Sequence, residues 1–234
     1  MFQIPTNVIV YMLAGIATFI VGVRSSLQYR KTKLSLSRHF AISGFSASAG
    51  LLLGSVPFLF TNDQDILRIS LIFARLLLDF VAFFQLYLIW YLSRLHKISI
   101  WWLVTPAAAL AIPSFVLQSM HFLSTFVGII NNEVIYTFID INKYTHLLSL
   151  VIVFIAGSFI MKNSFLQKDF RGKVRLFSIA LLYMGASLSD IYSFVFLHGL
   201  SNSWIVLVGY VVATGLFLVT TVVFLPKTKN NTLT

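Results

Sequence analysis

Long apolar segments separated by short polar ones dominate the chain. A stretch of about 20 apolar residues is long enough to cross the hydrocarbon core of a bilayer as a helix. Seven stretches of roughly this length occur along the sequence. The predicted helices span residues 8–23, 40–60, 66–92, 100–120, 146–162, 176–197 and 204–225. The pattern therefore predicts an all-α membrane protein, with residues 1–234 forming one domain, a bundle of seven transmembrane helices.

One connection is long enough to hold structure of its own. Between the fourth and fifth predicted helices, residues 126–130 and 133–139 are rich in β-branched and aromatic side chains, which favour strands. Asn131 and Asn132 lie between them and suit a tight turn. We expect a short β-hairpin over the mouth of the bundle; an amphipathic loop resting on the lipid headgroups is the alternative.

Composition agrees with the hydrophobic pattern. Hydrophobic residues make up 58% of the chain and charged residues only 10%, whereas a soluble domain has about 25% charged residues. The chain contains no cysteine, which excludes disulfides, thiol catalysis and thiolate metal sites. A net charge of +10 would indicate nucleic-acid binding in a soluble protein, but here we expect it to set membrane orientation instead.

The positions of the basic residues predict that orientation. The first, third and fifth connections and the tail together hold 14 of the 17 basic residues. They are Arg24, Arg30, Lys31, Lys33, Arg38, Arg94, Lys97, Lys162, Lys168, Arg171, Lys173, Arg175, Lys227 and Lys229. Because basic loops remain on the cytoplasmic side, we expect an outer amino terminus, a cytoplasmic carboxyl terminus and insertion in the plasma (inner) membrane. The expected partners are the lipid bilayer and a cytoplasmic signalling protein.

Three charged residues fall inside predicted helices. Arg75 and Asp79 are four apart in the third helix, so they lie one turn apart on the same face. Asp190 is at a similar depth in the sixth helix, in the outer half of the bundle. A charge in hydrocarbon costs roughly 2.5 to 3.5 kcal/mol, so such residues normally face protein or water and are paired. We expect Arg75 to be shared between the two carboxylates.

Two interpretations of this cluster remain open. It could be a buried ion pair that fixes helix register, or a polar pocket that binds a ligand, senses protons or passes a cation. In the second case Tyr192 and Tyr210 are candidates to line the pocket, with Ser189 and Thr214 as weaker ones. We expect Gln85, deeper in the third helix, to make a hydrogen bond between helices.

The histidines suggest a further site only weakly. His121, His146 and His198 lie at predicted outer helix ends, near Glu133 and Asp140. Histidines beside carboxylates could bind a divalent metal or respond to pH. Their irregular spacing favours solvated side chains at headgroup level, so we predict no metal site.

Several chemistries are excluded by residue type. A retinal protein needs a lysine in its seventh helix, and residues 204–225 contain none. No two histidines are four apart, which argues against a zinc hydrolase with an HxxxH pair. We find no catalytic constellation, and predict neither an enzyme nor a cofactor.

Small residues and prolines indicate how the helices pack. Ser46, Gly50 and Gly54 recur every four residues in the second helix, a spacing that lets another backbone approach closely. Pro106 and Pro113 fall within the fourth helix, and each removes a backbone donor and tends to kink a helix. We therefore expect close packing against the second helix and a bent fourth helix.

The first functional hypothesis is a sensory one. In helix number and orientation the chain is similar to the seven-helix sensor regions that precede bacterial signalling domains. This resemblance implies a receptor-like module that binds a ligand or senses protons in its outer half. Residues 226–234 are too few for a kinase or cyclase domain. The hypothesis therefore requires a separate cytoplasmic partner, reached through the basic inner loops, or a longer parent protein.

A small-solute or cation transporter is the second hypothesis, supported by a weak internal repeat. The residues that recur at an offset of 137 are Arg38, Phe40, Ile42, Ala49 and Leu51, matched by Arg175, Phe177, Ile179, Ala186 and Leu188. The match superposes helices one to three on five to seven, as in sugar-type transporters, although the Pro-Gln pair of that family is absent and chance could produce the matches. An accessory membrane subunit without a ligand is the third hypothesis.

Overall fold

The computed structural model describes residues 5–92, 99–120, 127–130, 133–136, 140–168 and 170–196. The side chains of some residues in these ranges lie outside the description; they are residues 6–7, 110–111, 114, 118, 127–130, 133–136, 140–143, 171, 175, 189–190 and 192–196. The predicted seventh helix, residues 204–225, also lies outside it.

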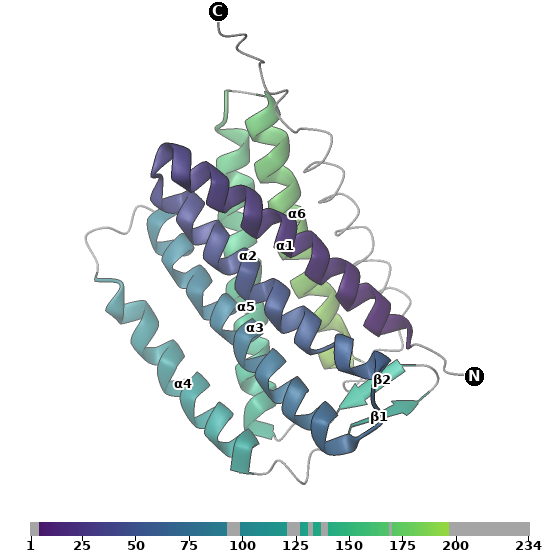
Figure 1. Cartoon of the computed structure of the whole chain (residues 1–234). Helices are drawn as coiled ribbons and strands as arrows, with labels where there is room; N and C mark the ends of the chain where they lie inside the picture. Colours follow the sequence, from purple (N-terminus) through teal and green to yellow (C-terminus); the bar gives the residue numbers. More distant parts are fainter. Residues whose placement is uncertain are drawn as a thin grey trace, which may run out of the picture.

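Six long helices form the described part of the molecule (Figure 1). They are α1 (Thr6–Thr32), α2 (Ser35–Leu53), α3 (Gln64–Leu92), α4 (Trp101–Met120), α5 (Asp140–Phe165) and α6 (Phe170–Phe196). The helix α1 packs on α2 and α5 packs on α6, while α3 contacts α2, α4 and α5. The central helix of the described bundle is therefore α3, the one that carries Arg75 and Asp79.

The ends of α1 and α2 differ from the predicted ones for local reasons. The helix α1 continues to Thr32, nine residues past the predicted end, and Lys33 then ends it in the left-handed region at φ 55°. Counting apolar residues detects the membrane-facing part of a helix and misses its basic extension. The helix α2 ends at Leu53, and Pro57 lies in the separate 3₁₀ helix η1 (Val56–Leu59), because proline cannot donate within a helix interior.

The position at which α5 starts has a larger consequence for the site. The prediction placed the start of this helix at His146, but α5 begins at Asp140. The first turn and a half is polar, so hydrophobicity alone does not reveal it. As a result His146 lies in the second turn of the helix rather than at its start, and its level relative to the headgroups stays a prediction.

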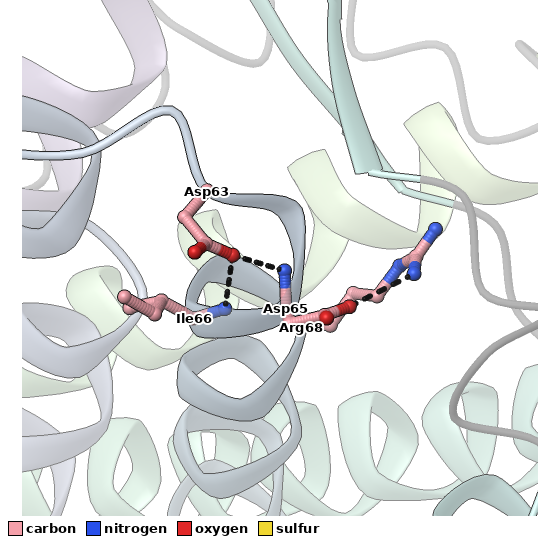
Figure 2. Close-up of polar contacts among 4 residues, drawn as sticks. All are labelled: Asp63, Asp65, Ile66 and Arg68. Carbon is pink, nitrogen blue, oxygen red and sulfur yellow. Dashed lines mark hydrogen bonds and ion pairs between the residues drawn. The ribbon is translucent and has the colours of Figure 1, made fainter.

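The start of α3 is fixed by an aspartate. The Asp63 carboxylate accepts hydrogen bonds from the backbone N–H groups of Asp65, at 2.9 Å, and Ile66, at 3.3 Å (Figure 2). This arrangement is an N-cap, which satisfies donors that a helix start leaves open. One turn later Arg68 Nη1 pairs with Asp65 Oδ1 at 3.3 Å (Figure 2).

The predicted hairpin is present. Strand β1 (Val127–Ile130) pairs antiparallel with β2 (Glu133–Tyr136), with Ile130 opposite Glu133. The turn residues between them lie outside the described ranges. The hairpin contacts α1 through β2 and α3 through β1, at the end of the bundle where α1 begins (Figure 1). We call this the hairpin end.

Small residues allow the close contact between α1 and α2. A Cβ atom added at Gly44 would lie 2.8 Å from the backbone nitrogen of Gly22, so the two backbones touch where neither has a side chain. The predicted role of Gly50 is confirmed: an added Cβ would lie 3.1 Å from the backbone oxygen of Ala74 on α3. The helix α4 runs through Pro106 and Pro113 as one element, and its bend stays a prediction.

Large apolar side chains face outward on the described helices. On α1 the exposed ones follow a helical stripe, Ile9, Leu13, Ile16, Phe19, Val23 and Leu27, and on α3 the stripe is Ile66, Ile69, Phe73, Leu76 and Phe80. The buried positions include many alanines and serines, together with His39 and Gln85. Three helical segments within the described residues are long and apolar enough to cross a membrane, Val8–Thr32, Ser35–Leu59 and Tyr144–Phe165.

Candidate ligand site

The predicted contact between Arg75 and Asp79 is present. Arg75 Nε donates to Asp79 Oδ2 at 2.9 Å, one turn along α3. Both side chains are largely buried, with 13% and 16% of their surface exposed. A pair this sheltered from water is screened far less than a surface pair, so the two charges hold each other firmly.

A third side chain, from α5, joins the pair. Arg75 Nη1 donates a hydrogen bond to His146 Nδ1. Because a guanidinium can only donate, His146 Nδ1 is the acceptor in this contact. The Ser149 hydroxyl, one turn further along α5, donates to His146 O at 2.7 Å and also contacts the Asp79 carboxylate. The cluster thus joins α3 to α5.

This cluster forms part of the wall of an internal cavity. The cavity measures about 310 Å³ and is lined by residues of α1, α2, α3, α5 and α6. Arg68, Arg75, Asp79 and His146 form its polar end, toward the start of α3. Apolar side chains make up most of the remaining wall, among them Phe40, Leu51, Leu78, Val153, Ile179 and Leu182.

A second polar group lies beyond Ala82, the last described lining residue of α3, and reaches the cavity only through Ser43. Gln85 is fully buried and donates through Nε2 to Ser43 Oγ at 3.1 Å and to Val81 O at 3.0 Å. Its Oε1 lies 3.1 Å from His39 Nε2. Because Val81 O can only accept, the amide orientation is fixed, and His39 Nε2 must donate to Oε1. The hydrogen bond predicted for Gln85 between helices is confirmed.

His39 is held by aromatic rings as well as by Gln85. Only 2% of its surface is exposed, and its ring stacks on Phe84 and Tyr87 of α3, with centroids 4.4 and 5.5 Å apart. Its Nδ1 has no hydrogen-bond partner within the described part of the chain. The residue precedes the apolar run of the second predicted helix, so hydrophobicity did not single it out.

The remaining predicted site residues are placed only in part. Asp190 and Tyr192 belong to α6, three and five residues beyond Ser187, which lines the cavity; their side chains, and that of Ser189, lie outside the description. Tyr210 and Thr214 lie outside it altogether. The three-way cluster with Asp190 therefore stays a prediction, whereas His146 is the partner that sequence reasoning missed.

The histidines and acidic residues considered as a metal site do not come together within the described residues. No three His, Asp or Glu side chains among them lie close enough to hold a metal ion. His121 and His198 are outside the described ranges, and His146 contacts Arg75 instead.

Comparison with known proteins adds no family. No family model matches the chain, and no curated protein or solved structure was found to be similar to it.

Proposed function

We propose that this chain is a seven-helix protein of the plasma membrane, with an outer amino terminus, that acts as a receptor-like or sensory module. In this proposal a small ligand binds in the internal cavity beside Arg75, Asp79 and His146. The role is non-enzymatic and would need a cytoplasmic signalling partner. The observation that carries it is the cavity, because it brings a paired arginine and aspartate to one wall of a mostly apolar space.

The membrane part of the proposal is supported by how side chains are sorted. Large apolar residues face outward along α1 and α3, while serines, His39 and Gln85 are buried. In water this arrangement would expose apolar patches larger than monomeric soluble proteins usually show. In a bilayer it leaves the outer surface to lipid and the polar groups to one another.

The ligand part is supported by the location of the charges. An ion pair whose only role was to fix helix register could be surrounded by closely packed side chains, because a buried pair needs no empty space beside it. Here the pair borders a cavity whose volume lies at the small end of the range for ligand sites, about 300 to 1,000 Å³. Helical spacing further predicts that Asp190, three residues beyond Ser187, stands on the same face of α6.

A transporter is the second candidate, favoured by two observations. Each of the pairs α1–α2 and α5–α6 forms an extensive contact in the described structure, and the two pairs correspond under the offset of 137 residues. The hydrogen-bonded side chains of Ser43, Gln85 and His39 also continue from the cavity toward the end of the bundle opposite the hairpin. Solute flux in proteoliposomes would favour this candidate over a sensor.

Two alanines on α2 test whether the cavity binds the ligand. Ala47 lines the cavity, whereas Ala49, two residues later, is exposed. The experiment is a thermal-unfolding screen of the full chain in lipid nanodiscs against a library of small molecules. Compounds that stabilise the wild type should lose their effect in Ala47→Leu, which fills part of the cavity, and keep it in Ala49→Leu. Equal stabilisation of both variants would contradict the proposal.

A further inference from the structure

We infer that the turn between α5 and α6 binds the headgroups of anionic phospholipids, with its large apolar side chains set into the bilayer boundary and its lysines against the lipid phosphates. This surface, the α5–α6 turn, consists of Lys162, Phe165, Leu166, Lys168, Phe170 and Lys173. The inference rests on the membrane insertion in the proposed function and not on the ligand in the cavity, so the two can be tested apart.

Three large apolar side chains are exposed where α5 ends and α6 begins. The exposed fractions are 59% for Phe165, 69% for Leu166 and 70% for Phe170. A backbone hydrogen bond from Leu166 N to Asn163 O, at 3.2 Å, closes the turn that presents them. The helical segment Tyr144–Phe165, which is long and apolar enough to cross a membrane, ends at this point. The three side chains therefore lie at the level where headgroups meet acyl chains, as the apolar faces of interfacial segments do.

Lysines accompany these apolar side chains. Lys162 and Lys168 are exposed, and Lys173 Nζ lies over the Phe165 ring, 5.5 Å from its centroid. None of the three lysines forms an ion pair within the described residues. A lysine at this level can lay its hydrocarbon stem along apolar surface and keep its charged end among the headgroups. The turn thus combines an apolar patch with charges that suit phosphate.

The sequence around the turn has a large excess of positive charge. The basic residues within 162–175 are Lys162, Lys168, Arg171, Lys173 and Arg175. The same segment has one acidic residue, Asp169, so an excess remains even where Asp169 pairs with one of them. The next acidic residue of α6, Asp190, is 15 positions beyond Arg175, or about 22 Å along the helix axis. Clusters of four to eight Lys and Arg residues next to a membrane helix are characteristic of binding to anionic lipids.

A second basic turn lies at the same end of the bundle. One buried cluster contains Leu88 of α3 and Ala156 of α5, and Leu36, near the start of α2, packs against it. The α1–α2 and α5–α6 turns therefore share the end of the bundle opposite the hairpin (Figure 1). Residues 24–38 add five basic residues and no acidic one. This second turn strengthens the attraction to an anionic surface within about a Debye length.

A lipid surface fits the α5–α6 turn better than an acidic protein does. The exposed apolar side chains follow directly on a helix that is apolar enough to cross the membrane, so the bilayer is already beside them. The lysines alternate with these side chains along the chain, which places the charges and the apolar groups at one level. Headgroups and acyl chains meet in the same way at the surface of a bilayer.

Brominated lipids test the inference through a single fluorescent label. The chain has no cysteine, so Gln167→Cys, at an exposed position of the turn, can be labelled with bimane. The full chain is reconstituted in phosphatidylcholine vesicles that contain increasing fractions of brominated phosphatidylglycerol or brominated phosphatidylcholine. We expect phosphatidylglycerol to be preferred about fivefold at this label, which corresponds to roughly one lysine contact. High salt should reduce the preference.

A second label and two double variants show whether the turn is the site. Val151→Cys lies on the same helix and is 43% exposed on the outer surface; with the same label it should be quenched equally by both lipids. On the Gln167→Cys background, Lys162→Gln/Lys168→Gln should bring the preference close to one. Arg30→Gln/Lys31→Gln removes two exposed charges from the α1–α2 turn and should lower the preference less than twofold.

The possible failures can be told apart. Equal quenching of the Gln167→Cys label by both lipids would overturn the inference and favour an acidic protein as the partner. Quenching at Val151→Cys alone would also overturn it, because the turn would then stand away from the bilayer. Equal effects of the two double variants would show that the charge acts without a site at the turn. Absence of quenching at both labels would contradict the membrane insertion itself, whereas the comparison of Ala47→Leu with Ala49→Leu tests the ligand cavity independently.

Discussion

At the scale of single residues, the site rests on one arginine that contacts two partners. A spacing of four on a helix made the contact with Asp79 predictable from the sequence, because the geometry is local. The contact with His146 was not predictable, since it joins residues 71 positions apart and depends on α5 beginning at Asp140. Gln85 was predicted to bond another helix because a buried amide needs partners, but its partner His39 lies outside the apolar run and was missed.

The ion pair predicts a large difference between two similar substitutions. Asp79→Asn leaves Arg75 as a largely buried charge without its counter-ion, and should lower the free energy of unfolding by about 3 kcal/mol. Asp65→Asn makes the same change at an exposed pair on the same helix, and should alter it by less than about 0.5 kcal/mol. Reversible unfolding in mixed micelles measures both. Equal losses would show that the Arg75–Asp79 pair contributes no more than a surface pair.

At the scale of helices, close approach of backbones sets the packing of α1, α2 and α3. The regular spacing of Ser46, Gly50 and Gly54 predicted a packing face, and Gly50 does contact α3. The tighter contact is between Gly22 and Gly44, which the sequence did not indicate because each is a single glycine whose partner is on another helix. Helix ends were predicted less well than helix positions, since basic and polar turns extend α1 and α5 beyond their apolar parts.

The contact between Gly22 and Gly44 predicts that two glycines of α2 differ in how well they tolerate substitution by alanine. A methyl group at Gly44 would lie 2.8 Å from the backbone of Gly22, which cannot move without separating the helices. Gly44→Ala should therefore cost about 1 to 2 kcal/mol of stability through overpacking. At Gly54 the nearest atom would be Ala74 Cβ, at an ordinary 3.4 Å, so Gly54→Ala should stay within about 0.5 kcal/mol of the wild type. The same unfolding assay measures both variants. If Gly44→Ala is as stable as Gly54→Ala or more stable, the close packing of α1 on α2 is contradicted.

At the scale of the whole molecule, hydrophobicity alone predicted the helical architecture of the described residues. Apolar runs predicted the positions of the six described helices, and three described segments are apolar enough to cross a membrane. The predicted seventh helix, the orientation of the chain and the plasma-membrane location depend on residues or surroundings that the described structure does not include. They remain predictions, supported by the basic loops and by the outward apolar stripes.

The most direct measurement compares the two faces of α5. The chain has no cysteine, so a single introduced thiol can be followed without background. Val153 lines the cavity, and Val151 lies 43% exposed on the outer surface. A water-soluble methanethiosulfonate reagent should modify Val153→Cys, in a cavity that a ligand enters from water. It should leave Val151→Cys unmodified, because lipid covers that face. Modification of Val151→Cys alone would place water on the outside and contradict a ligand cavity within a membrane bundle.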